Sequence, residues 1–124
     1  MLVPTLARLL PLGLLSFAVG CSSTCEKNSC ACQEACNRLY QESECNIIEV
    51  GNQTRDERIL DCVQTCENAL ETPGEIREDY DPYEYTPQDE AVEFTNDKEA
   101  ALWMECVAET SCELIADGYC APLP

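Results

Sequence analysis

The sequence from Cys32 to Cys66 reads CQEACNRLYQESECNIIEVGNQTRDERILDCVQTC, with one Cys-x3-Cys step at each end. Side chains four residues apart lie on the same face of an α-helix, so Cys32 with Cys36, and Cys62 with Cys66, each mark one helical face. Between the two steps, Gly51-Asn52 is a turn signal. We therefore expect two antiparallel helices, joined by a turn, whose cysteine faces meet.

Disulfides between these two helices are sterically easier to form than disulfides within either one. Packed helix axes lie about 8–10 Å apart, with each Cα about 2.3 Å off its axis, so facing Cα atoms come within the range that a disulfide accepts. Within one helix, Cβ atoms four residues apart are separated by about 5–6 Å, whereas a disulfide needs about 3.8 Å. The predicted bridges are therefore Cys36–Cys62 (inner) and Cys32–Cys66 (outer).

Capping signals set the expected ends of the hairpin helices. The composition is helical from Ser23 to Glu44, and the helix begins either at a capping box formed by Ser23 and Glu26 or, as we favour, near Asn28. The second helix is expected to begin at the capping box Thr54-Arg55-Asp56-Glu57 and to end at Pro73-Gly74.

Two further helix starts follow an acidic loop at about residues 72–95. Asn96-Asp97-Lys98-Glu99 is another capping box, and Trp103 is expected to pack in the core. Thr110-Ser111-Cys112-Glu113 predicts a kink or a short extra helix that closes at Gly118. The sequence thus predicts an all-α fold, with a small disulfide-rich helical hairpin, one or two further short helices and a long acidic loop.

Residues 1–20 have the pattern of an export signal. They hold Arg8 as their one charged residue, and an interrupted apolar run from Leu9 to Val19 follows it. No later segment approaches the roughly 18 consecutive apolar residues of a membrane-spanning helix. We expect the exported product, residues 21–124, to have no membrane span.

The end of this signal has two interpretations, which differ in the fate of Cys21. Small residues at Ala18 and Gly20 suit ordinary signal-peptidase cleavage. The segment from Ala18 to Cys21 also resembles a bacterial lipobox, which implies that Cys21 carries a lipid anchor and that residues 22–24 form a tether. Setting Cys21 aside leaves an even number of the eleven cysteines, which favours lipidation because the rest can close as five disulfides in an oxidising compartment.

The composition of residues 21–124 indicates that the chain needs disulfides in order to fold. Leu, Ile, Val and Phe make up only about 15 per cent of residues 21–124, and the chain has a net charge of −17, values that are typical of disordered chains. Cysteine-rich scaffolds fold with an undersized core because each bridge contributes about 2–4 kcal/mol. We expect residues 25–124 to form one such domain. Its remaining cysteines have fifteen alternative pairings, which the sequence leaves open: Cys25, Cys30, Cys45, Cys106, Cys112 and Cys120.

The twin Cys-x3-Cys pattern resembles the helical hairpins of mitochondrial intermembrane-space carriers and of plant α-hairpinin peptides. That resemblance covers the hairpin alone and implies shared architecture without a shared activity. The whole chain resembles small cysteine-rich bacterial lipoproteins, a group without a common activity.

Catalysis finds little support in the residues present. The chain has no histidine, which excludes Ser-His-Asp and Cys-His arrangements. It also has no Cys-x-x-Cys redox motif, and a structural role is favoured for the Cys30-Ala31-Cys32 step. We expect no enzymatic activity, no catalytic residue and no cofactor.

Metal binding by thiolates is the main alternative to disulfides. Cysteines four residues apart on a helical face could hold Cu(I) or zinc, and the step resembles that of some bacterial copper-storage bundles. The oxidising compartment implied by the signal favours disulfides, as does the scarcity of methionine, since Met104 is the only one after residue 20. We therefore assign no metal ligands.

The acidic loop is the remaining candidate site, and its segment 78–87 combines two prolines with three tyrosines. The simplest interpretation is a solvated charged loop that folds independently of the core. If it binds a partner, Tyr80, Tyr83 and Tyr85 are the expected anchors, because they are rigid amphipathic groups in an acidic field. That field would attract a basic protein surface or divalent cations, and it excludes nucleic acid because phosphates would be repelled.

Taken together, these patterns predict an exported, lipid-anchored, non-catalytic binding or structural module of a bacterial cell envelope. Thiolate storage of Cu(I) or zinc is one alternative. The other is a freely secreted disulfide-rich effector or inhibitor in which Cys21 is a structural cysteine.

Overall fold

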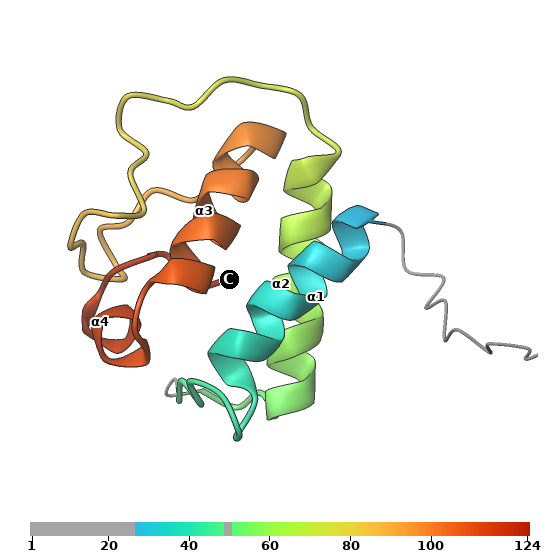
Figure 1. Ribbon diagram of the computed structural model, residues 1–124, viewed down its shortest axis with the longest axis vertical. Coiled ribbons are helices and arrows are strands. Elements are labelled where there is room, and N and C mark those ends of the chain that lie inside the picture. The colour runs from blue at the N-terminus through green and yellow to red at the C-terminus, as the bar shows by residue number, and fades with distance from the viewer. Residues whose placement is uncertain (1–26, 49–50) are drawn as a thin grey trace, which may run out of the picture.

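The computed structural model describes residues 27–48 and 51–124, and the regular secondary structure in these ranges is entirely α-helical. Figure 1 shows α1 and α2 crossing each other, α3 beside them, and a long segment arching from the end of α2 to the start of α3. The predicted fold class is confirmed. The helices are α1 (Lys27–Tyr40), α2 (Arg55–Leu70), α3 (Asp97–Glu109) and α4 (Cys112–Asp117).

Helix α2 begins where its capping box predicts. The Thr54 side chain accepts a hydrogen bond from the backbone N–H of Glu57 at 3.2 Å, and the Glu57 carboxylate accepts one from the backbone N–H of Thr54 at 2.8 Å. The helix ends at Leu70, slightly before the predicted stop at Pro73-Gly74. The residue before a proline is disfavoured in the α conformation, so the last turn cannot extend to the proline itself.

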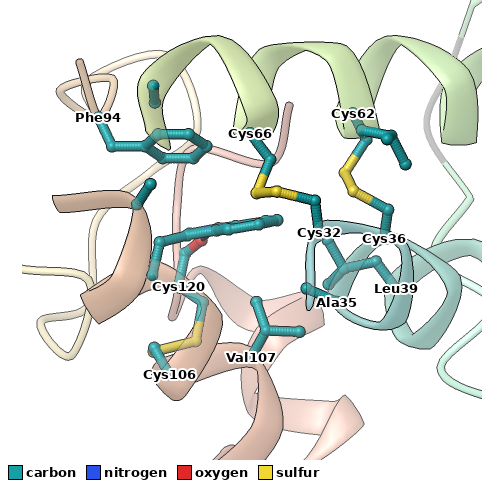
Figure 2. Packing of buried hydrophobic residues seen from close by; sticks show 14 of the residues in the cluster. Cys32, Ala35, Cys36, Leu39, Cys62, Cys66, Phe94, Cys106, Val107 and Cys120 are labelled. Carbon is teal, nitrogen blue, oxygen red and sulfur yellow. Dashed lines mark hydrogen bonds between the residues drawn. A yellow bond between two sulfur atoms is a disulfide. The ribbon is translucent and has the colours of Figure 1, made fainter. Parts of the chain in front are cut away.

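Two disulfides join α1 to α2 in the predicted register. Cys32 is bonded to Cys66 with the Cα atoms 5.7 Å apart, and Cys36 is bonded to Cys62 with the Cα atoms 5.9 Å apart. Figure 2 shows the two bridges side by side between the helices. All four cysteines are fully buried, so the bridges occupy the centre of the hairpin, where apolar side chains would otherwise pack.

The start of α3 departs in one detail from the predicted capping box. The Asn96 side chain accepts a hydrogen bond from the backbone N–H of Glu99 at 3.0 Å, as a cap should. The Glu99 carboxylate, however, turns away from Asn96 and accepts hydrogen bonds from Thr95 and Arg77. The Asn96 half of the capping box is thus present. The Glu99 half is absent because the Glu99 carboxylate binds Arg77, which is distant in the sequence.

Trp103 lies in the core, as the sequence predicts. Its side chain is fully buried, it packs against Phe94 with the ring centroids 4.9 Å apart, and its indole N–H donates to the carbonyl of Cys120 at 3.2 Å. The short extra helix, α4, is also present, and Gly118 caps it with a positive φ of 130°. One cluster of buried residues joins these elements to the hairpin.

One described disulfide links the hairpin to the C-terminal half. It joins Cys45, after α1, to Cys112, at the start of α4, with the Cα atoms 5.0 Å apart. Arg38 of α1 reinforces the link, since its guanidinium donates to the carbonyls of Val107 and Thr110 at 2.7 and 2.8 Å and so caps the C-terminal end of α3. Within residues 27–48 and 51–124, no helix is both long and apolar enough to cross a membrane.

Candidate interaction surface

The acidic loop between α2 and α3 is tied to the core by an ion pair between the partly exposed Arg77 and the buried carboxylate of Glu99. Glu99 of α3 is fully buried, and its carboxylate accepts hydrogen bonds from the backbone N–H groups of Arg77 and Thr95, each at 3.0 Å. The Arg77 side chain completes the pair, with Nε 2.9 Å from Oε2. Burial alone would raise the pKa of Glu99, but these hydrogen bonds and the charge of Arg77 outweigh it and lower the pKa to about 2.

Tyr80 lies in the core, contrary to its expected role as an exposed anchor. Only 4 per cent of the residue is accessible, and its hydroxyl is buried without a hydrogen-bond partner in the described part of the chain. Burial and the nearby charge of Glu99 raise the pKa of this phenol well above its usual range. The neighbouring Pro82 is also fully buried. The segment is therefore not a solvated loop independent of the core.

A second attachment holds the loop against the end of α4. The carbonyl of Pro82 accepts a hydrogen bond from the backbone N–H of Cys120 at 2.7 Å, and the carbonyl of Gly118 accepts one from Thr86 at 3.1 Å. A Cβ atom added at Gly118 would lie 3.0 Å from the Thr86 carbonyl oxygen and 3.1 Å from the ring of Tyr85. The positive φ and this close approach both require glycine there.

The other two tyrosines of the loop are exposed. Tyr85 is 61 per cent accessible and packs edge-on against Tyr119, with the centroids 6.0 Å apart. Tyr83 is 40 per cent accessible, and its hydroxyl lies 3.3 Å from the Glu109 carboxylate. Of the three tyrosines named as anchors if the loop binds a partner, these two are therefore the exposed ones.

Tyr83 stands among carboxylates from two elements. Partial burial is the largest cause that raises the pKa of its phenol, and the charges of Glu105, Glu109 and Asp81 raise this pKa further. We call these four residues the Tyr83 cluster. The loop contributes Tyr83 and Asp81, and α3 contributes the two glutamates. Tyr83 thus lies exposed at the surface in contact with two carboxylate residues, Asp81 and Glu109, and in the electrostatic field of Glu105.

An apolar groove runs beside this cluster, between α1 and α3. It holds about 400 Å³, and Glu105 stands at its edge, so the groove and the Tyr83 cluster share a residue. We call it the α1/α3 groove. Its lining also includes small or flexible apolar side chains and two other charged residues: Ala31, Ala35, Met104, Val107, Ala108, Glu34 and Arg38.

The positive charge of Arg38 in this groove is already engaged. Its guanidinium donates to two carbonyls at the end of α3, and it lies 3.8 Å from the carboxylate of Glu44. Among the residues that the structure describes, the exposed charges that remain at the groove edges are therefore those of Glu34 on α1 and Glu105 on α3. An aromatic ring and carboxylates beside an apolar groove are chemically suited to a ligand that is both cationic and apolar.

The cysteines that the sequence marks as site residues are either disulfide-bonded or outside the described residues. Cys21 and Cys25 lie outside the described residues, while Cys30 is disulfide-bonded. The pairings that the sequence left open include Cys45–Cys112 and Cys106–Cys120. Among the described residues, no group of three or more Cys, Asp or Glu side chains is arranged to hold a metal ion.

Sequence reasoning missed the α3 side of this surface. Glu105 and Glu109 are four residues apart on a helix whose start was predicted, so their shared face could have been derived from spacing alone. Their proximity to Tyr83 could not, because it depends on how the loop folds back across α3.

Comparison with protein-family models, with curated proteins and with solved structures found no match to this chain.

Proposed function

We propose that the protein is an exported, disulfide-stabilised, non-catalytic module that binds a basic protein surface through the Tyr83 cluster. The observation that carries this proposal is the position of Tyr83, which is exposed, contacts Glu109 and lies in the field of Glu105 and Asp81. Tyrosine is enriched among the residues that dominate binding energies, and its ring attracts lysine and arginine side chains. The surrounding carboxylates would add charge-assisted hydrogen bonds to such a side chain.

The charge of the whole chain supports a basic partner. A net charge of −17 speeds the approach of a cationic surface and repels phosphates, anionic lipids and a second copy of the chain. Long-range attraction of this kind chiefly raises the association rate. It is screened by salt, so this effect should weaken as the ionic strength rises. Specific contacts at the Tyr83 cluster would then set the rate of dissociation.

The location that we propose is the outer side of an exporting membrane, with Cys21 as the lipid-anchored first residue. The apolar pattern of residues 1–20 supports export, and the buried disulfides of the hairpin are typical of oxidising compartments. The intact mass of the natural product tests both points together. A mass showing acylation at Cys21 and ten oxidised cysteines agrees with the proposal. An unmodified Cys21 would favour free secretion instead.

Thiolate storage of metal is disfavoured by the state of the hairpin cysteines. Cys32, Cys36, Cys62 and Cys66 are all in disulfides, and a disulfide sulfur carries no thiolate charge to bind Cu(I) or zinc. A free-thiol count on natural protein distinguishes the two functions. A value near zero agrees with the binding module, and eight or more free thiols would support storage.

Binding can be tested with deca-lysine as a defined cationic probe, using fluorescence anisotropy at low and physiological salt. We expect Tyr83→Ala, and separately Glu105→Gln with Glu109→Gln, to weaken binding at least fivefold. The matched control removes two charges at Glu71 and Glu93. Glu93 is exposed, and its carbonyl accepts a hydrogen bond from Arg77 near the first turn of α3. Glu71 follows the end of α2, which lies beside the start of α3, far from Glu109 at the other end of that helix.

The comparison between these two double variants decides the outcome. If the Glu105/Glu109 and Glu71/Glu93 variants weaken binding equally, deca-lysine senses only the net charge and the proposed site is wrong. Unchanged binding by Tyr83→Ala would also contradict it.

A further inference from the structure

We propose that the α1/α3 groove is the second half of this site and accepts the apolar face of a basic amphipathic helix from the partner. This inference rests on the proposed function, since it extends the surface that begins at the Tyr83 cluster. The groove and the cluster meet at Glu105. This residue lines the groove, and its charge raises the pKa of Tyr83 in the cluster.

The shape of the groove suits a helix. Ala31 and Ala35 lie one turn apart on α1, and Met104 and Ala108 lie one turn apart on α3, so each wall presents an i, i+4 row. Helices pack by fitting side-chain ridges into the grooves between such rows, and small residues allow a close approach. A partner helix would anchor through its own i, i+3, i+4 and i+7 apolar positions.

The volume of the groove also exceeds what a stray side chain needs. About 400 Å³ lies within the roughly 300–1,000 Å³ that is usual for ligand pockets. The floor is closely packed, because Ala35 and Val107 are buried and Arg38 bridges α1 to the end of α3. Met104, in contrast, is half-buried and unbranched, so it can adjust to the shape of an incoming side chain.

Charge identifies the occupant. Glu34 stands on the α1 side of the groove and Glu105 on the α3 side, with Glu109 one turn further along α3. A helix with lysine or arginine on both flanks of an apolar stripe would pair with both sides at once. A second copy of this chain brings the same net charge of −17, and an anionic membrane surface is repelled by it.

The test compares two lysine- and leucine-containing 14-residue peptides of one composition. In one, the leucines form a single helical stripe, and in the other they are scrambled around the helix. We expect the striped peptide to bind the natural chain at least tenfold more tightly than the scrambled one. Ala108→Trp, which fills the groove without changing charge, is expected to abolish this preference while leaving deca-lysine binding unchanged. Ala31→Phe, on the opposite wall, is expected to act in the same way.

The control is Ala116→Trp, the same kind of substitution on an exposed residue of α4 that does not line the groove. It should keep the tenfold preference. Equal binding of the two peptides to the natural chain would overturn the inference, and so would a preference that survives both groove-filling variants. Failure of the proposed function has a different signature, namely deca-lysine binding that does not respond to changes in the Tyr83 cluster.

Discussion

Arg77 donates both its backbone N–H and its side-chain Nε–H to one oxygen of the buried Glu99 carboxylate, at 3.0 and 2.9 Å. The two residues lie 22 positions apart, so this contact fixes the acidic loop to the first turn of α3. Glu99 also lies near the N-terminal end of that helix, where the helix dipole favours a negative charge. The hydrogen bond to Glu99 in turn raises the pKa of Arg77.

Replacing Glu99 by Gln should lower the free energy of unfolding by about 2–3 kcal/mol, because charge-assisted hydrogen bonds are lost inside the core. Denaturant unfolding at pH 7 measures this effect. Asp89→Asn is the matched control, since Asp89 is an exposed acid of the same loop, and it should change stability by less than about 0.5 kcal/mol. Equal effects of the two substitutions would mean that Arg77 and Glu99 do not hold the loop.

The same pair predicts a pH dependence. The pKa of Glu99 falls from its ordinary 4.5 to about 2 on folding, so its contribution is complete above pH 4.5 and is lost as the pH falls toward 2. The difference in unfolding free energy between the natural chain and Glu99→Gln should therefore shrink across this window. Using the difference cancels the titration of the many other carboxylates. A difference that stays constant from pH 6 to pH 2 would contradict the assignment.

Gly118→Ala should detach the exposed part of the loop. The substitution places a Cβ atom at a φ of 130° and within 3.1 Å of the Thr86 carbonyl and the Tyr85 ring, so we expect a loss of more than about 1 kcal/mol. Amide hydrogen exchange should accelerate at Thr86, whose N–H donates to Gly118, and remain unchanged at Cys66 within α2. Unchanged protection at Thr86 would show that the loop does not depend on this contact.

Removing the disulfide between Cys45 and Cys112 should loosen the two halves of the fold without unfolding either. In the loop-entropy description, a bridge across 67 residues contributes about 4 kcal/mol, so the double serine variant should lose a substantial part of its stability. Both cysteines are only half-buried, so little packing is lost in addition. Far-UV circular dichroism should stay helical while the denaturation midpoint falls. A change below about 1 kcal/mol would mean that Arg38 and the shared core suffice.

The hairpin could be predicted from the sequence because its rules are local. A four-residue cysteine step fixes a helical face, and two such steps on antiparallel helices allow only one comfortable register, that of Cys32–Cys66 and Cys36–Cys62. The Thr54 capping box is also local and was predicted to the residue. The link from Cys45 to Cys112 was not predictable, because it depends on where α4 packs, and nothing in the spacing specifies that.

The burial of the three loop tyrosines could not be predicted from the sequence. Tyr80, Tyr83 and Tyr85 share one acidic, proline-containing context, yet the first is buried and the other two are exposed. A segment without a helical or strand period gives no signal of which side chains face inward. Burial of Tyr80 follows instead from the attachment of the loop at Arg77 and at Pro82, which are contacts with distant residues.

The central claim is that the two hairpin disulfides replace the apolar burial that this composition lacks. It is tested most directly by far-UV circular dichroism before and after full reduction at pH 7 and 25 °C, with thiols blocked by alkylation. We expect the helical signal to collapse on reduction, and the double variant Cys32→Ala with Cys66→Ala to lose at least 2 kcal/mol of stability while oxidised. A reduced chain that keeps its helical signal and its cooperative unfolding would contradict this account.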